Sequence, residues 1–122
     1  MDNSQFYKSV LEQDRAAIVI CDLEHIIIYM NPAAVRRYAK HGDLLGKSLL
    51  ACHNEHSNEA IKRVVSWFSE DKSHNIVYTF RNEKENKDVY MVALRDEGGE
   101  LIGYYEKHEY RDRETMKMYD LT

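Results

Sequence analysis

The apolar residues of this chain change their spacing near residue 74, and this change restricts the chain to folds that combine helices with a sheet. Before it, a helix is predicted from Ser57, its N-cap, to about Ser69, with Glu59 in its first turn. The apolar face of this helix consists of Ile61, Val64, Val65 and Phe68. After it, β-branched and aromatic residues predict three consecutive antiparallel strands, at residues 75–81, 88–95 and 100–109.

The first third of the chain predicts a β-hairpin followed by short helices. Strands at residues 16–21 and 25–30 are rich in β-branched and aromatic residues, and the polar residues between them suit a turn. Asn31 then provides an N-cap, with proline as the first helical residue, for a short helix through Tyr38. Residues 44–50 resemble a pair of helical turns. Two strands, several short helices and three strands predict an α+β domain in which helices cover one face of the sheet.

The two ends of the chain are predicted to lie outside this domain, which spans residues 14–110. Residues 1–13 are expected to form a short helix whose apolar stripe must be covered by another surface. The stripe consists of Phe6, Tyr7, Val10 and Leu11. The charged residues 111–122 are expected to form a C-terminal tail or a short helix.

Composition excludes several classes of protein. With 122 residues, of which 43% are hydrophobic and 31% charged, the chain suits one globular domain. Its net charge of −4 gives no basic field for nucleic acid or an anionic membrane, so neither is expected as a partner. The longest aliphatic run is far shorter than the roughly 20 residues of a spanning helix, and the N-terminus does not resemble a signal peptide. A cytoplasmic protein is predicted, with Cys21 and Cys52 as buried, reduced thiols.

Three segments of the chain resemble a PAS sensor domain, over about residues 14–110. The most specific is the strand that ends in Tyr-x-Asn-Pro-Ala-Ala, from Tyr29 to Ala34. A Leu-Leu-Gly-Lys-Ser-Leu-Leu turn follows it, and Asp-Glu-Gly-Gly-Glu-Leu-Ile-Gly occurs near the end, at residues 96–103. The turn after Cys21 lacks the glycine common at that place, a change that leaves the hairpin intact. The resemblance implies a five-stranded antiparallel sheet in the order 2-1-5-4-3, with helices that enclose a cavity against one face.

The resemblance also implies a function without catalysis. Such domains are sensor or interaction modules, and they bind diverse ligands, so the fold alone does not identify the ligand. We expect a signalling module that responds to a small molecule in its cavity, or to a contact with another protein, and acts on a signalling partner in trans. In another hypothesis, the core is filled by its own side chains and the domain serves protein interaction alone. A homodimer is expected through the N-terminal helix, by burial of Phe6, Val10 and Leu11.

The predicted ligand pocket lies between the long helix and the inward residues of the last strands. Its apolar lining suits an apolar or aromatic ligand. The pocket is predicted to contain Ile61, Val64, Val65, Phe68, Tyr78, Tyr90 and Tyr104. Most of the tyrosines are expected to pack in the core or on the surface, but a free hydroxyl in an apolar pocket can orient a polar ligand.

Residues 52–56, Cys-His-Asn-Glu-His, form the most suggestive local cluster. The resemblance places them just before the long helix, near the position where haem-binding PAS domains supply their axial ligand. His53 or His56 is therefore a candidate ligand for haem iron, in an alternative function as a gas or redox sensor. The competing interpretation is a polar loop with two exposed histidines, and this interpretation is preferred because Asn54 and Glu55 suit a wet loop.

Other cofactors are not expected. Cys52, His53 and His56 match no familiar zinc spacing, so no metal site is predicted. Covalent attachment of haem would need a cysteine at Leu49. Flavin photochemistry would need a cysteine within an Asn-Cys-Arg-Phe-Leu-like segment, which the chain lacks.

No catalytic residues are predicted. The acidic residues Asp96, Glu97 and Glu100 gather at a strand turn, where a solvated hairpin explains them. Ser48 and Ser57 have no defined histidine and acid partners, and helix capping or a polar turn accounts for both. The glycine pair before the last strand joins two strands rather than a strand and a helix, so it is not a phosphate-binding loop.

Overall fold

The computed structural model describes residues 2–122 and contains one five-stranded antiparallel sheet. The strands are β1 (Val19–Asp22), β2 (Ile27–Met30), β3 (Ile76–Asn82), β4 (Lys87–Arg95) and β5 (Leu101–Tyr110). Their order in the sheet is β2-β1-β5-β4-β3, and each neighbouring pair is antiparallel. Both the predicted α+β class and the predicted strand order are therefore confirmed.

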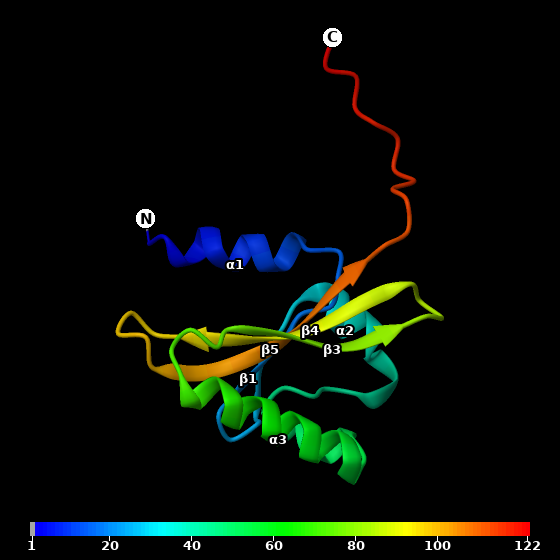
Figure 1. Ribbon diagram of the computed structural model, residues 1–122. Coiled ribbons are helices and arrows are strands. Elements are labelled where there is room, and N and C mark those ends of the chain that lie inside the picture. Colours follow the sequence, from blue (N-terminus) through cyan, green and yellow to red (C-terminus); the bar gives the residue numbers. More distant parts are fainter. Residues whose placement is uncertain (1) are drawn as a thin grey trace.

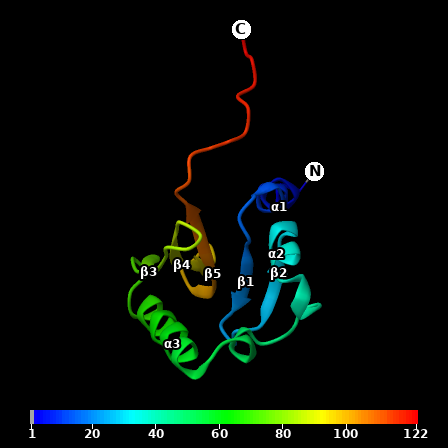
Figure 2. The same ribbon diagram turned by 90° about the vertical axis from the view of Figure 1, so that its right-hand side faces the viewer.

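The helices lie on both sides of this sheet. They are α1 (Ser4–Gln13), α2 (Pro32–Arg37) and α3 (Glu55–Glu70), with short 3-10 turns η1 (Ala39–His41) and η2 (Leu49–Cys52). In Figure 1, α3 lies below the sheet and α1 above it, and Figure 2 shows the same separation from the side. We call the face toward α3 the inner face and the face toward α1 the outer face. No helix among residues 2–122 has the length and apolar character needed to cross a membrane.

The first hairpin forms as predicted, but its strands are shorter than the sequence pattern indicated. β1 begins at Val19, later than predicted, and β2 begins at Ile27 because the turn between the two strands is longer than predicted. The Asp22 side chain accepts hydrogen bonds from the backbone N–H groups of Glu24 (2.9 Å) and Ile26 (3.0 Å), which holds the chain in the turn. His25 adopts a positive φ of 66° within it. Ile26, just before β2, forms an isolated bridge with Ser48 and is not part of the paired register of β1 and β2.

Two helical predictions are corrected by the structure. The cap of α3 is Asn54, whose side chain accepts from the backbone N–H of Ser57 at 2.8 Å, so Ser57 and Glu59 do not form the start of the helix. Asparagine caps as well as serine does, and Glu55 becomes the acidic residue of the first turn. Residues 44–50 do not form two helical turns; only η2 forms there, capped by Ser48.

Asn31 connects three parts of the fold from a fully buried position. Its side-chain oxygen accepts from the backbone N–H groups of Ile18 and Ala34, both at 2.9 Å, so it caps α2 as predicted and also holds the chain entering β1. Its amide group donates to the backbone carbonyls of Leu11, Asp14 and Ala16. The end of α1 is thereby fixed to the start of the sheet.

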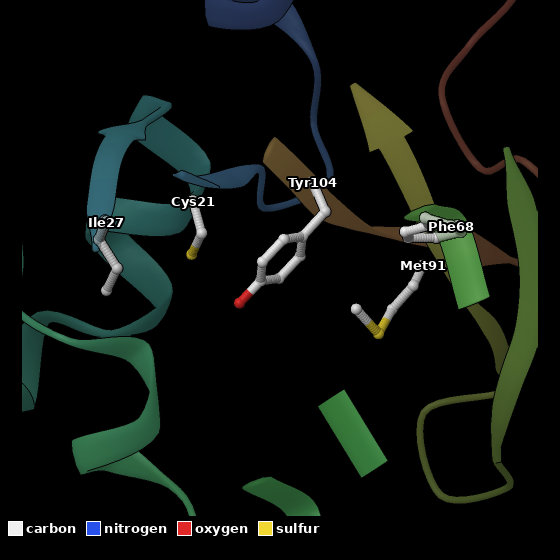
Figure 3. Close-up of a cluster of buried hydrophobic side chains, with 5 residues drawn as sticks. All are labelled: Cys21, Ile27, Phe68, Met91 and Tyr104. Carbon is white, nitrogen blue, oxygen red and sulfur yellow. The ribbon is translucent and has the colours of Figure 1, made fainter. Parts of the chain in front are cut away.

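The hydrophobic core lies between the inner face and α3. Figure 3 shows the Tyr104 ring reaching from β5 into the space between Cys21 on β1 and Met91 on β4. Ile27 and Phe68 complete this buried cluster. Residues 111–122 have no regular secondary structure and extend away from the sheet (Figures 1 and 2), so the C-terminal segment is a tail and not a helix.

Candidate functional site

A cavity of about 190 Å³ lies on the inner face of the sheet. Its apolar walls come from the strands, α3 and the loop before it: Ala17, Val19, Ile27, Leu44, Leu49, Ile61 and Met91. Its polar and sulfur-bearing walls are Cys21, Tyr38, His41, Cys52, His53, Tyr104, Glu106 and His108. A pocket with apolar walls and a few polar groups is the usual form of a small-molecule site.

Strand β5 supplies one polar wall through its alternation. Side chains two residues apart on a strand share a face, so Tyr104, Glu106 and His108 all lie toward the cavity. Tyr105 and Lys107 lie between them on the outer face, opposite Val92 and Tyr90 of β4. One strand therefore carries the cavity wall on one side and the surface beneath α1 on the other.

Tyr104 joins the cavity to the first hairpin. Its hydroxyl lies 2.8 Å from Nδ1 of His25 in the turn between β1 and β2. Burial raises the pKa of Tyr104, and burial also raises the pKa of the neighbouring Cys21 thiol to about 11. Both groups are neutral at physiological pH, so Cys21 is not an activated nucleophile.

Glu106 and His108 form the ionisable part of the cavity wall on β5. Nε2 of His108 lies 3.4 Å from a carboxylate oxygen of Glu106. Burial lowers the pKa of His108 to about 4, because only 6% of its side chain is exposed, and the imidazole is neutral at pH 7. Burial raises the pKa of Glu106, although 51% of that side chain is accessible and lines the cavity. The carboxylate is thus reachable by a small molecule yet surrounded by protein.

The residues predicted for the ligand pocket divide into three groups in the structure. Ile61 and Tyr104 line the cavity. Val64, Val65 and Phe68 pack in the hydrophobic core and do not line it.

Tyr78 and Tyr90, the remaining members of the set, lie on the outer face. They are opposite each other on β3 and β4, with ring centres 5.3 Å apart. The Tyr78 hydroxyl donates to Asp88 at 2.6 Å, and the Tyr90 hydroxyl accepts from Arg111 at 3.1 Å. Because Met91 faces the cavity, the alternation of β4 places Tyr90 on the other side of the sheet.

Sequence reasoning missed part of the cavity wall. Glu106 and His108 could have been found, since they follow Tyr104 at intervals of two residues on a predicted strand. Tyr38 and His41 reach the cavity from α2 and η1, and no sequence pattern indicated this. Their position depends on how the irregular chain between β2 and α3 folds back over the sheet.

The cluster at residues 52–56 is only partly brought to the cavity. His53 lines it and holds its Nδ1 at 2.9 Å from the carbonyl of Leu49, whereas His56 is exposed in the first turn of α3 and does not line it. Cys52 is exposed, and so the prediction that both thiols are buried is wrong for this one. Residues 2–122 contain no group of three histidine, cysteine or acidic side chains placed to hold a metal ion.

The cavity does not fit a haem. Pockets for drug-sized ligands have volumes of about 300–1,000 Å³, and haem needs a pocket of at least that class. The cavity of about 190 Å³ is smaller, although Nε2 of His53 is not used by the contact to Leu49. An apolar cavity of about 150 Å³ accommodates benzene, so this one suits a molecule with a single ring and a small substituent.

Comparison with solved structures identifies similar folds. The PAS domain of a protein from Colwellia psychrerythraea has a TM-score of 0.64 at 16% sequence identity, over 90% of this chain and 98% of that one. The PAS domain of BvgS from Bordetella pertussis has a TM-score of 0.62 at 16% identity, over 93% and 89% of the two chains. A sensory box sensor histidine kinase from Vibrio cholerae has a TM-score of 0.60 at 14% identity, over 89% and 92%. At these identities, the likeness shows the fold alone.

Comparison of sequences identifies the family. No curated protein sequence matches the chain significantly. The sequence profile described as "PAS domain" matches residues 15–106, which include all five strands up to the middle of β5 and all the helices after α1. Because this match covers most of the chain and agrees with the strand order, the chain belongs to the PAS domain family.

Proposed function

We propose that this chain is a non-enzymatic sensor module that binds a small molecule in its cavity and transmits the state of the cavity to a signalling protein. The observation that carries the proposal is the cavity itself, which combines apolar walls with a polar wall on β5. A core filled by its own side chains, as a pure interaction domain would have, is disfavoured by the volume of about 190 Å³. The cytoplasmic location stays a prediction from the sequence.

The sheet offers a route from the cavity to the outer face. A ligand that contacts Tyr104 acts on β5, whose next residue, Tyr105, lies opposite Ile20 and beneath the connection from α1. On the same face, the Tyr29 hydroxyl donates to Glu12 of α1. A shift of β5 or β1 against the neighbouring strands therefore moves the outer-face residues that contact α1 and its connection to the sheet.

Helix α1 is the proposed dimer contact. It contains no buried residue, and its apolar side chains Phe6 and Val10 are 60% and 72% exposed. A helix of ten residues is marginal in water without burial of its apolar stripe. A second copy of the chain, related by twofold symmetry, supplies that burial.

The dimer is tested with the double variant Phe6→Glu, Val10→Glu. Four like charges then face each other across the twofold contact, and we expect the dimer to become a folded monomer. Sedimentation of both chains gives the masses, and circular dichroism shows whether the sheet is retained. The matched control is Lys8→Glu, on the same helix but outside the apolar pair, which leaves the dimer intact. A wild-type monomer at high concentration would overturn the proposed contact.

The partner is proposed from the family. The similar structure from Vibrio cholerae is that of a sensor histidine kinase, so a protein of phosphorelay signalling is the partner class we propose here. Two candidate reactive groups of the cavity are not activated: burial raises the pKa of the Cys21 thiol to about 11, and the Tyr104 hydroxyl lies 2.8 Å from Nδ1 of His25. The signal is therefore expected to pass through contact and not through a reaction.

The cavity is tested by filling it from α3. The variant Ile61→Trp places a larger side chain at a cavity-lining position, whereas Ser66→Trp places the same side chain at an exposed position of the same helix. A ligand that raises the melting temperature of the wild type and of Ser66→Trp is expected to have no effect on Ile61→Trp. Equal stabilisation of all three folded proteins would show that the ligand binds elsewhere.

A further inference from the structure

The polar wall of the cavity includes a histidine that is buried and neutral. The His108 side chain is 6% exposed, and its Nδ1 atom is buried without a hydrogen-bond partner. The other ring nitrogen, Nε2, faces Glu106 at 3.4 Å, so the tautomer with its proton on Nε2 suits the carboxylate and leaves Nδ1 as an acceptor. Nδ1 has almost no accessible surface, so it is not open to a molecule in the cavity, and the neutral imidazole leaves the carboxylate of Glu106 without a cation on this side of the wall.

The same wall contains a carboxylate without a cationic partner. Lys87 and Arg37 are close enough to Glu106 to interact with its charge. Both, however, form ion pairs with Glu85, with nitrogen–oxygen distances of 3.5 and 2.9 Å. His53 also faces Glu106 across the cavity and interacts with it favourably. Among residues 2–122, no lysine or arginine forms an ion pair with Glu106, and its only basic neighbour at salt-bridge distance is His108.

A positively charged nitrogen with N–H groups would give the Glu106 carboxylate the cationic partner that it lacks. It would donate to the Glu106 carboxylate, whose side chain is 51% accessible, and the aromatic side chains of Tyr38 and Tyr104 line the same cavity. An anionic group would meet a carboxylate surrounded by protein, with no free cation to oppose it. A divalent metal ion is disfavoured because no set of three ligands converges here among residues 2–122.

We propose that the ligand of this cavity is a small cationic amine, with one aromatic or aliphatic ring and a protonated nitrogen directed to the carboxylate of Glu106. The ring occupies the apolar part of the cavity, between Ile27, Leu49 and Ile61, and its size follows from the volume of about 190 Å³. This inference rests on the proposed ligand-binding function of the cavity and adds the chemical class of the ligand.

The test is calorimetric titration of the full chain with three probes of one size: benzylamine, benzyl alcohol and benzoate. We expect benzylamine to bind at least roughly tenfold more tightly than benzyl alcohol, and benzoate most weakly, since a charged hydrogen bond is stronger than a neutral one. The variant Glu106→Gln is expected to remove the preference for benzylamine. The control Glu109→Gln lies on the same strand but on the outer face, beside Lys107, and keeps the preference.

The outcomes separate this inference from the proposed function. If benzyl alcohol or benzoate binds as tightly as benzylamine, and Ile61→Trp abolishes that binding, the cavity is a ligand site but the cationic class is wrong. If no probe binds in a way that Ile61→Trp abolishes, the ligand-binding function fails as well. Should Glu106→Gln not fold, the order of the three probes on the wild type still decides the class.

Discussion

Replacement of Asn31 by alanine is expected to lower the free energy of unfolding by roughly 3–5 kcal/mol. The substitution removes the cap of α2 and leaves the backbone N–H of Ile18 without its acceptor. It also removes the donor for the carbonyls of Leu11 and Ala16, each at 3.0 Å. Because Asn31 is fully buried, the substitution leaves these backbone groups without partners away from bulk water. Chemical denaturation monitored by circular dichroism measures the difference.

Asn54→Ala is the matched control for this prediction. Asn54 caps α3 with one hydrogen bond, to Ser57, at an exposed position, so its loss should cost only about 1 kcal/mol. The loss of unfolding free energy in Asn31→Ala beyond that in Asn54→Ala measures the contribution of the hydrogen bonds that fix α1 to the domain. Equal losses in the two variants would show that Asn31 acts as a simple cap and does not connect α1 to the sheet.

Replacement of Gly103 by alanine is expected to destabilise the domain by more than about 2 kcal/mol, through steric conflict between β5 and β1. A Cβ atom at this position would lie 2.3 Å from the carbonyl oxygen of Cys21 and 3.5 Å from Cα of Asp22. Both contacts are with backbone, so no side chain can move aside. The two central strands must separate, and they carry the cavity residues Cys21 and Tyr104. We therefore expect ligand stabilisation to decrease together with the melting temperature.

Gly98→Ala provides the comparison on the same hairpin. Its Cβ atom would meet only the side chain of Asp96, at 3.4 Å, which is an ordinary contact. The stability of this variant is expected to stay within about 0.5 kcal/mol of the wild type. If Gly103→Ala were as stable as Gly98→Ala, the close approach of β1 and β5 in the structure would be incorrect.

The parts of the fold predicted best were those with strong local signals. The Asn31-Pro32 cap and the β-branched runs that became β1 and β4 each encode their structure over a few residues. The start of α3 was misplaced because Asn54 and Ser57 are both good caps, and only the position of the preceding chain decides between them.

The candidate site was harder to predict because it depends on register. Tyr90 and Met91 are adjacent, and the sequence alone does not state which of the two faces the helices; the structure places Met91 there. For β5, the pattern from Tyr104 onward contains the ionisable residues Glu106 and His108 at inward positions, where hydrophobic residues are expected. A polar inward face on a central strand was the available signal for a binding site.

A native mass spectrum of the intact chain as purified tests the proposed sensor function most directly, because it reports bound mass and oligomeric state together. We predict a species of two 14.4 kDa chains that carries additional mass of a small organic molecule, and the loss of this mass on denaturation. Addition of benzylamine to a ligand-free sample should restore a bound mass, and Ile61→Trp should prevent this. A bare monomer that stays bare with every added probe would contradict both the ligand cavity and the dimer.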